Sequence, residues 1–189
     1  NSHGHPDHFK REILQLREQY KEAQYILSRD IYFRREDRRE WIHSVKAREA
    51  YEIGNLQIRT LRSTDLGVAY VVETEGKRIC HAGDLNWWHW EEESKAYNEM
   101  MRRKYQHEIS KIEGEAIDAA FLPLDPRQEE QYAWGFDYFM RHTRTKHAFP
   151  MHMWGQYDIC DKLLGDPVSE PYREAVMCVE GPQQVFSVL

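Results

Sequence analysis

The start of the chain has a helical pattern of apolar residues. They recur three to four positions apart among charged residues: Phe9, Ile13, Leu16 and Tyr20. This spacing predicts an amphipathic helix over residues 7–21. Residues 25–28 are predicted to form a short buried strand, and residues 34–41 a second, shorter helix whose charges form a solvated face.

The middle of the chain alternates apolar and polar residues in the manner of strands. The alternation covers residues 49–84, and three sequences typical of turns interrupt it: Gly54-Asn55, Asp65-Leu66-Gly67 and Glu75-Gly76. It predicts about four consecutive strands, of which the last covers residues 78–81.

The second half of the chain alternates helices and strands. A long helix is predicted over residues 91–112, and Gly114 provides a C-cap. It is followed by a strand (117–122), a helix (129–141), a strand (147–151), a short helix (157–164) and a final strand (184–188). Sheets covered by outer helices bury the apolar faces of such a chain, so we expect an α/β fold.

Composition indicates a single globular domain over residues 1–189, since this length suits one core. No apolar run approaches the length of about 18 residues that a membrane span needs, and the N-terminus has no signal-peptide pattern. We therefore expect a cytoplasmic protein without membrane partners. The net charge of −6 argues against a nucleic-acid partner, although a local basic groove stays open.

The cysteines suggest no crosslink. Cys80, Cys160 and Cys178 are odd in number and have no CxxC spacing, so the sequence predicts neither a disulfide framework nor a zinc ribbon. We expect all three to be reduced and mostly buried.

The strongest chemical pattern lies at the N-terminus, in His3-Gly4-His5-Pro6-Asp7-His8. Residues two apart in an extended segment point the same way, so His3 and His5 can hold one metal ion. Asp7 and His8 can then turn toward a second ion beside it. Imidazole and carboxylate together suit Zn²⁺, or Mn²⁺ and Fe²⁺ where oxygen ligands dominate.

Two other origins of this pattern carry less weight. In chains of this length and composition, chance alone would produce the pattern in about one or two of a thousand. A remnant of an affinity tag is the other alternative, but tags rarely carry an aspartate and run directly into an amphipathic helix.

HxHxDH resembles the signature of the metallo-β-lactamase superfamily, and two further motifs follow in that family's order. Ile79-Cys80-His81-Ala82-Gly83-Asp84 resembles the strand that ends in the bridging aspartate, and Phe149-Pro150-Met151-His152 the strand that ends in the last histidine ligand. The resemblance implies a four-layer αββα sandwich and a metal-dependent hydrolase with two ions. The residues within these motifs are most similar to those of the branch that includes sugar-phosphate lactonases.

Each later motif also has a structural interpretation. Gly-Asp at a strand end is usually an ordinary turn, and a lone His152 would more often be a packed or surface residue. His81 could orient a ligand or be a buried structural histidine. Because both later motifs occur together with the first one, we assign Asp84 and His152 as ligands.

The chain departs from the family where a further histidine is expected. Alignment on Gly67 places Thr64 at that position, with Asp65 beside it. A threonine hydroxyl is a poor ligand for Zn²⁺, so either Asp65 substitutes or the first site is weak; a simple turn over residues 63–65 is the alternative.

A second departure is that the family's N-terminal strands do not precede the motif. Part of one sheet would be absent, which leaves an open edge and an uncovered apolar face. We expect an upstream segment, or a second copy of the chain in a homo-oligomer, to complete the sheet.

The resemblance implies a water, activated by the metals, that attacks an ester, lactone or phosphodiester, with Asp7 as the catalytic base or orienting group. The Trp87 to Trp90 cluster is expected to form a wall of the pocket or to cover the sheet. Arg127 and Arg144 are candidate anion holders. The competing hypothesis is a catalytically degenerate scaffold that keeps the fold and binds metal.

Overall fold

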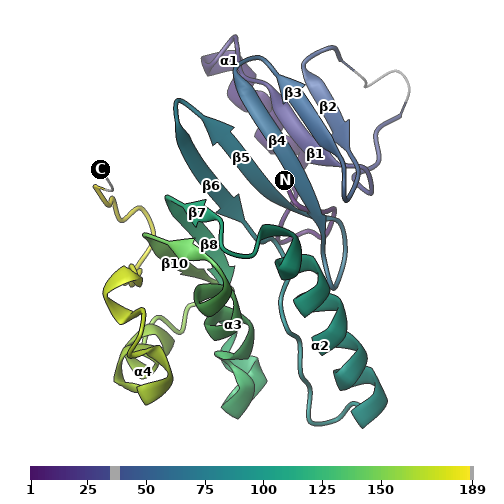
Figure 1. Ribbon diagram of the computed structural model, residues 1–189. Helices are drawn as coiled ribbons and strands as arrows, with labels where there is room; N and C mark the ends of the chain where they lie inside the picture. Colours follow the sequence, from purple (N-terminus) through teal and green to yellow (C-terminus); the bar gives the residue numbers. More distant parts are fainter. Residues whose placement is uncertain (35–38, 188–189) are drawn as a thin grey trace.

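The computed structural model describes residues 1–34 and 39–187. Its largest element is a mixed six-stranded sheet in the order β10-β8-β6-β5-β4-β3 (Figure 1). The strands are β3 (Ala50–Ile53), β4 (Leu56–Arg62), β5 (Val68–Thr74), β6 (Lys77–His81), β8 (Ala119–Pro123) and β10 (Ala148–Met151). The four strands predicted within residues 49–84 are confirmed as an antiparallel series from β3 to β6.

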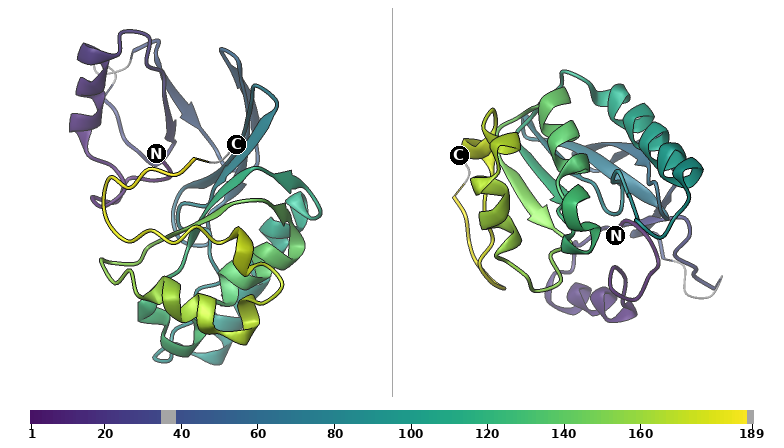
Figure 2. Two further views of the ribbon diagram at one scale, coloured as in Figure 1. Left: turned by 90° about the vertical axis from the view of Figure 1, so that its left-hand side faces the viewer. Right: turned by 90° about the horizontal axis from the view of Figure 1, so that it is seen from below.

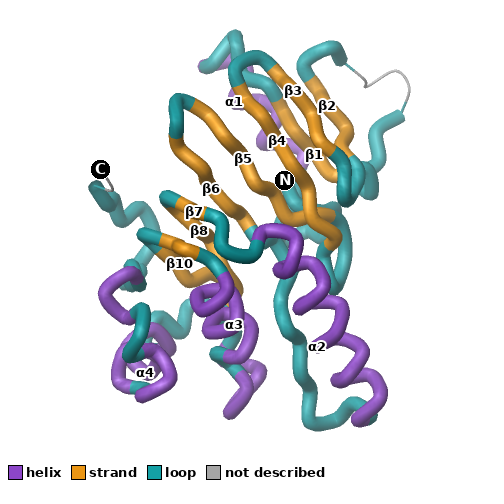
Figure 3. The backbone as a smooth tube through the Cα atoms, viewed as in Figure 1, coloured by secondary structure: helices purple, strands orange, loops and turns teal. Residues whose placement is uncertain are grey.

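Three helices cover one face of this sheet. They are α2 (Lys95–Ile109), α3 (Trp134–His142) and α4 (Ile159–Gly165), and they lie together on one side of the strands in Figure 3. Leu61, Ala69 and Val71 point from the sheet into a core with Tyr105 and Phe136 of the helices. Burial of these apolar side chains is the main force that holds the helices on the sheet.

The opposite face of β4 and β5 is covered by a small parallel sheet. It consists of β1 (Tyr25–Ser28) and β2 (Ile42–Val45), and Val45 packs with Ile58 and Val68 of the large sheet. An outer layer of helical turns covers β1: a 3-10 helix (Arg11–Gln15) and α1 (Leu16–Gln19), which Figure 2 shows beyond the small sheet. The layers are therefore α, β, β and α, as predicted, and the second sheet has two strands among the described residues.

A row of rings covers the same face beyond β5. His81 stacks on Phe121, Phe121 on Phe149, and the ring of Phe186 meets Phe149 edge-on. Phe186 belongs to the C-terminal segment, which crosses this side of the molecule in Figure 2.

Several predicted elements need correction. The helix predicted over residues 7–21 begins only at Arg11, because residues 5–9 form a turn closed by the carbonyl oxygen of His5. The helix predicted over 129–141 begins at Trp134, since Glu129 has a positive φ of 50°. Asp118 divides the strand predicted over 117–122 into β7 (Ala116–Ile117), paired with β9 (Arg144–Thr145), and β8.

Two further predictions touch residues that the structure does not describe. The centre of the helix predicted over 34–41 lies outside the described residues, and residues 39–41 are not helical. The final strand predicted over 184–188 is wrong for residues 184–187, which pair with no strand, and residue 188 lies outside the described part. β2 was not predicted, because Ile-His-Ser-Val is short and half polar.

The cysteine prediction is wrong for two of the three residues. Cys160 of α4 forms a disulfide with Cys178, which follows 18 positions later, whereas Cys80 is free and buried. Nothing in their sequence spacing indicates the bond, since it arises from the return of the C-terminal segment along α4. No helix in the described ranges is both long and apolar enough to cross a membrane.

Candidate metal centre

Contacts with two strand ends fix the N-terminal segment that carries His3 and His5. The carbonyl oxygen of Ser2 accepts a hydrogen bond from the Val68 amide (2.9 Å), and the Gly4 amide donates to Asp30 Oδ2 (2.8 Å). The segment lies so close to Gly67 that a Cβ there would be 2.0 Å from the Ser2 oxygen. Gly67, with φ of +73°, thus permits both the turn and the approach.

The first group of potential ligands consists of His3, His5 and Asp84. His3 Nε2 lies 3.1 Å from His5 Nδ1 and 3.3 Å from Asp84 Oδ2. His3 is fully buried, and this burial lowers the pKa of its imidazole, which favours the neutral form that binds metal. The Ser2 hydroxyl lies 3.1 Å from the other ring nitrogen, Nδ1, and helps to fix the orientation of the ring.

The second group consists of His8, Asp84 and His152. His8 Nε2 and His152 Nε2 lie 3.2 Å and 2.9 Å from the same oxygen, Asp84 Oδ1. Asp84 therefore faces one carboxylate oxygen to each group. Burial alone would raise the pKa of Asp84, but the hydrogen bond and charge of His152, together with the charges of His3 and His8, outweigh it and lower this pKa.

Asp7 and Asp65 lie at the edge of these groups. Asp7 Oδ2 is 3.6 Å from His8 Nε2, and Asp65 Oδ2 is 4.0 Å from His5 Nδ1. Both side chains are about half exposed and line a pocket of about 280 Å³ together with His5, Asp84 and His152. The structure thus brings all seven predicted metal-site residues to one region.

Thr64 does not face this pocket. Its buried hydroxyl donates to the carbonyl oxygen of Asn86 (2.7 Å) and accepts from the Asn86 amide (3.0 Å). It thereby ties the β4–β5 turn to the loop that carries Asp84. His81 acts on the same loop, since its Nδ1 accepts a hydrogen bond from the Gly83 amide (3.1 Å), and burial lowers its pKa to about 4.

Asp125 is a residue of this centre that the sequence analysis missed. It is fully buried just after β8, and its Oδ2 lies 3.7 Å from Nδ1 of His152, a buried atom with no hydrogen-bond partner among the described residues. Burial opposes a charge on His152, but Asp125 and Asp84 outweigh it and raise the pKa of His152 to about 9. An aspartate just after a buried strand, as at Asp84, was the available signal.

Aromatic rings and one arginine form the wall of the pocket. Trp88, Trp90 and Trp154 line it, and the Arg127 guanidinium lies 5.7 Å and 4.4 Å from the ring centres of Trp90 and Trp154. Asp125 accepts a hydrogen bond from Arg127 Nε (2.9 Å), which holds the guanidinium there.

The other residues of the expected wall lie elsewhere. Trp87 and His89 pack against Trp134, with ring centres 5.3 Å and 4.9 Å apart. Arg144 does not line the pocket and donates instead to the carbonyl oxygen of Gly114. Only half of the Trp87 to Trp90 cluster, and one of the two candidate arginines, therefore belongs to the site.

The donor atoms fit divalent metal ions. Imidazole nitrogens and carboxylate oxygens lie within 4.8 Å of one another in each of the two groups. His3 Nε2 and His5 Nδ1 lie 3.1 Å apart, a distance at which two nitrogen lone pairs would repel each other. Either a proton on one nitrogen or a metal ion bound to both removes this repulsion. Nitrogen and oxygen donors in this number are typical of zinc sites.

Comparisons with known proteins match this chain to solved structures alone. No protein-family model and no curated protein sequence matches the chain. Matching solved structures include a protein predicted to be a zinc-dependent hydrolase of the metallo-β-lactamase superfamily from Thermotoga maritima, zinc-bound PqqB from Methylobacterium extorquens, and a diphosphatase of the PhnP family.

These likenesses are distant. The identities are 17%, 14% and 14%, the TM-scores are 0.38, 0.40 and 0.42, and the matches cover 67%, 74% and 80% of this chain. The chain spans 57%, 53% and 58% of those structures, a little over half of each. One of the three is described as a member of the superfamily that the sequence motifs resemble, but at these TM-scores the likeness carries no argument about this chain.

Proposed function

We propose that this chain is a metal-dependent hydrolase with a two-ion centre. One ion would be held by His3, His5 and Asp84, and the second by His8, Asp84 and His152. The observation that carries the proposal is the placement of Asp84: its Oδ2 faces His3 of the first group, and its Oδ1 faces His8 and His152 of the second. Zn²⁺ is the ion that suits these donors best, and Mn²⁺ or Fe²⁺ would follow if Asp7 and Asp65 also bind.

Metal ions in this position would supply Lewis acidity, which generates a nucleophile from water near neutral pH and stabilises charge on the substrate. The chain's own groups have separate tasks. Asp7, at the pocket edge, orients the attacking water or takes its proton. Arg127 holds an anionic group of the substrate, and the rings of Trp88 and Trp90 shield the pocket from solvent.

The substrate would be a small ester, lactone or phosphodiester, since all three present an electrophilic centre beside an oxygen that a metal can polarise. The competing proposal is a degenerate scaffold that binds metal without turnover. It is favoured by the lack of a third histidine at Thr64, whose hydroxyl is turned to backbone atoms instead.

The first prediction separates these proposals by metal counting and hydrolysis. We expect about two zinc ions per chain by elemental analysis, together with hydrolysis of p-nitrophenyl ester or phosphodiester substrates. Asp84→Ala should lose both ions and all turnover, because both groups share this residue. His5→Ala should weaken only the first group.

Asp161→Ala is the matched control, because Asp161 is an exposed carboxylate on α4 outside the centre. It should bind metal and turn over substrate like the unchanged chain. Two bound ions without turnover of any ester, lactone or phosphodiester would favour the scaffold. A chain that binds no metal would overturn both proposals.

A further inference from the structure

A second, larger pocket adjoins the metal centre. It has a volume of about 670 Å³ and lies between the ends of β1 and β2, the β4–β5 turn and the C-terminal half of α2. Asp65 lines both this pocket and the one at the metal centre. α2 also lines both, with Met101 at the metal centre and Lys104 one turn further on. A ligand in the large pocket could therefore reach the centre past Asp65.

The pocket is basic although the whole chain is acidic. Its cationic side chains number six: Arg29, Lys46, Arg48, Arg62, Arg103 and Lys104. Three acidic side chains also line it, namely Asp30, Asp65 and Glu108. The chain as a whole has a net charge of −6. A local surplus of positive charge on such a protein attracts anions to this place.

Three of the cations have no charge partner in the described part of the chain. Lys46 pairs with Glu49, Arg48 with Glu108, and Arg103 with Glu99. By contrast, the exposed side chains of Arg29, Arg62 and Lys104 have neither an ion pair nor a hydrogen bond to a described residue. Arginine forks and lysine ammonium groups left free in this way are suited to phosphate oxygens.

We propose that this pocket binds the phosphate group of a small phosphorylated molecule and holds that molecule beside the metal centre, an inference that rests on the proposed hydrolase function for its substrate role. The volume is within the range of about 300 to 1,000 Å³ that is usual for small-molecule sites. Ala47, which is partly exposed, adds an apolar contact for the carbon frame. The acidic chain disfavours a long polyanion, which would lie along its surface.

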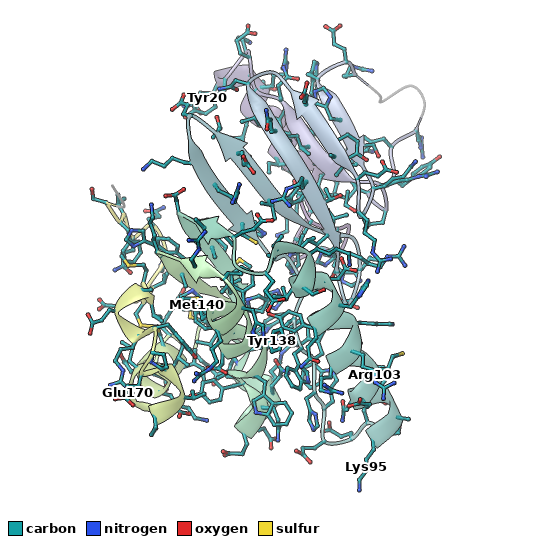
Figure 4. The ribbon with its side chains drawn as sticks, in the orientation of Figure 1. Tyr20, Lys95, Arg103, Tyr138, Met140 and Glu170 are labelled. Carbon is teal, nitrogen blue, oxygen red and sulfur yellow. A yellow bond between two sulfur atoms is a disulfide. The ribbon has the colours of Figure 1, made fainter. Side chains whose placement is uncertain are left out.

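The test measures pyrophosphate binding by calorimetry on the full chain in the presence of EDTA, so that no metal contributes. We expect measurable binding that weakens as salt increases. The double substitution Arg62→Gln with Lys104→Gln should weaken it by about tenfold or more. Its matched control is Lys77→Gln with Lys95→Gln, which removes the same charge from exposed positions outside the pocket. Figure 4 shows Lys95 near the start of α2, well apart from Arg103, which lines the pocket.

Each outcome decides the inference separately from the hydrolase proposal. If Asp84→Asn still binds pyrophosphate, the inference is supported, because the anion is then held by the basic pocket and not by the metal ligands. Loss of binding in Asp84→Asn, unchanged affinity in the Arg62 and Lys104 double variant, or no binding in the starting chain would overturn it. Tighter binding of a deoxythymidine oligonucleotide than of pyrophosphate would also overturn it, in favour of a polyanion. None of these results depends on whether metal binds.

Discussion

At the scale of single residues, the carboxylate of Asp125 lies behind His152 and faces its free ring nitrogen at 3.7 Å. We predict that Asp125→Asn weakens zinc binding by about 10- to 100-fold, because a carboxylate behind a histidine ligand fixes its orientation and raises its basicity. Competition with a chromogenic chelator measures the affinity.

Asp118→Asn is the control at the opposite end of β8 from Asp125. Its carboxylate accepts hydrogen bonds from the Arg78 amide and Lys146. Its zinc affinity should match that of the unchanged chain. Equal zinc affinity in Asp125→Asn would show that Asp125 does not position His152.

Glu108 is a buried carboxylate whose contribution should depend on pH. Burial raises its pKa, but hydrogen bonds from the Arg62 amide, Arg48 and Lys111 outweigh this and lower it. The stabilisation is therefore present above the pKa of an unfolded glutamate, about 4.3, and is lost as the pH falls through the lower folded value.

We predict that Glu108→Gln lowers the free energy of unfolding by about 1–3 kcal/mol at neutral pH. The difference from the unchanged chain should shrink below about pH 4. Urea unfolding at neutral and acidic pH measures it. A difference that stays constant with pH would contradict the assigned role of the charge.

Residue spacing alone showed the local part of the site, and Asp84 and His152 were added to it only through the family resemblance. His3 and His5 could be recognised because an extended segment places them on one side within a few residues. Asp125 could not be linked to His152, since only the parallel pairing of β8 with β10 brings their ends together. Thr64 was aligned with a ligand position, whereas its hydroxyl faces the backbone of residues 84–86.

At the scale of elements, the turn between β4 and β5 positions the first ligands. Gly67→Ala would place a Cβ 2.0 Å from the Ser2 oxygen and 2.6 Å from His3 Cβ. We predict a loss of at least about 2–4 kcal/mol in stability, from the positive φ and the clash together, and weakened zinc binding. Thermal unfolding and zinc titration measure the two effects.

Gly54→Ala is the matched control in the turn between β3 and β4. Its φ of +61° is similar, but a Cβ there would meet nothing within 4 Å. It should cost only about 1–2 kcal/mol and leave zinc binding unchanged. Equal effects of the two substitutions would mean that the close approach at Gly67 does not matter.

Elements with a strong local pattern were predicted well, and elements set by tertiary contacts were not. Clear alternation with glycine turns specified β3 to β6. In contrast, the N-terminal helix is shorter than its periodicity indicates, because residues 5–9 are used for a turn that carries the ligands. The pattern of β2 is weak, and its place depends on parallel pairing with β1.

At the scale of the whole molecule, the disulfide between Cys160 and Cys178 fastens the C-terminal segment to α4. It closes a loop with a sequence separation of 18 residues. We predict that replacing both cysteines by serine lowers stability by about 3 kcal/mol, since the unfolded chain regains the entropy of the open loop. Urea unfolding with and without a reductant measures this.

The control is Cys80→Ser, which keeps the disulfide, so its unfolding should respond to reductant as that of the unchanged chain does, whereas the variant with both cysteines replaced should not respond. Zinc binding should be unchanged when the disulfide is removed, because neither cysteine lies at the metal centre. Unfolding of the unchanged chain that is insensitive to reductant would contradict the predicted stabilisation.

The sharing of Asp84 between both histidine groups also bears on the order of folding. Its partners come from the first residues of the chain and from the end of β10, so the ligands meet only after β6, β8 and β10 have paired. Contacts between such distant parts of a chain form late and slow the folding rate. Ions that bind only this assembled state would slow unfolding more than they speed folding. The stability that metal adds should therefore appear mainly as a lower unfolding rate.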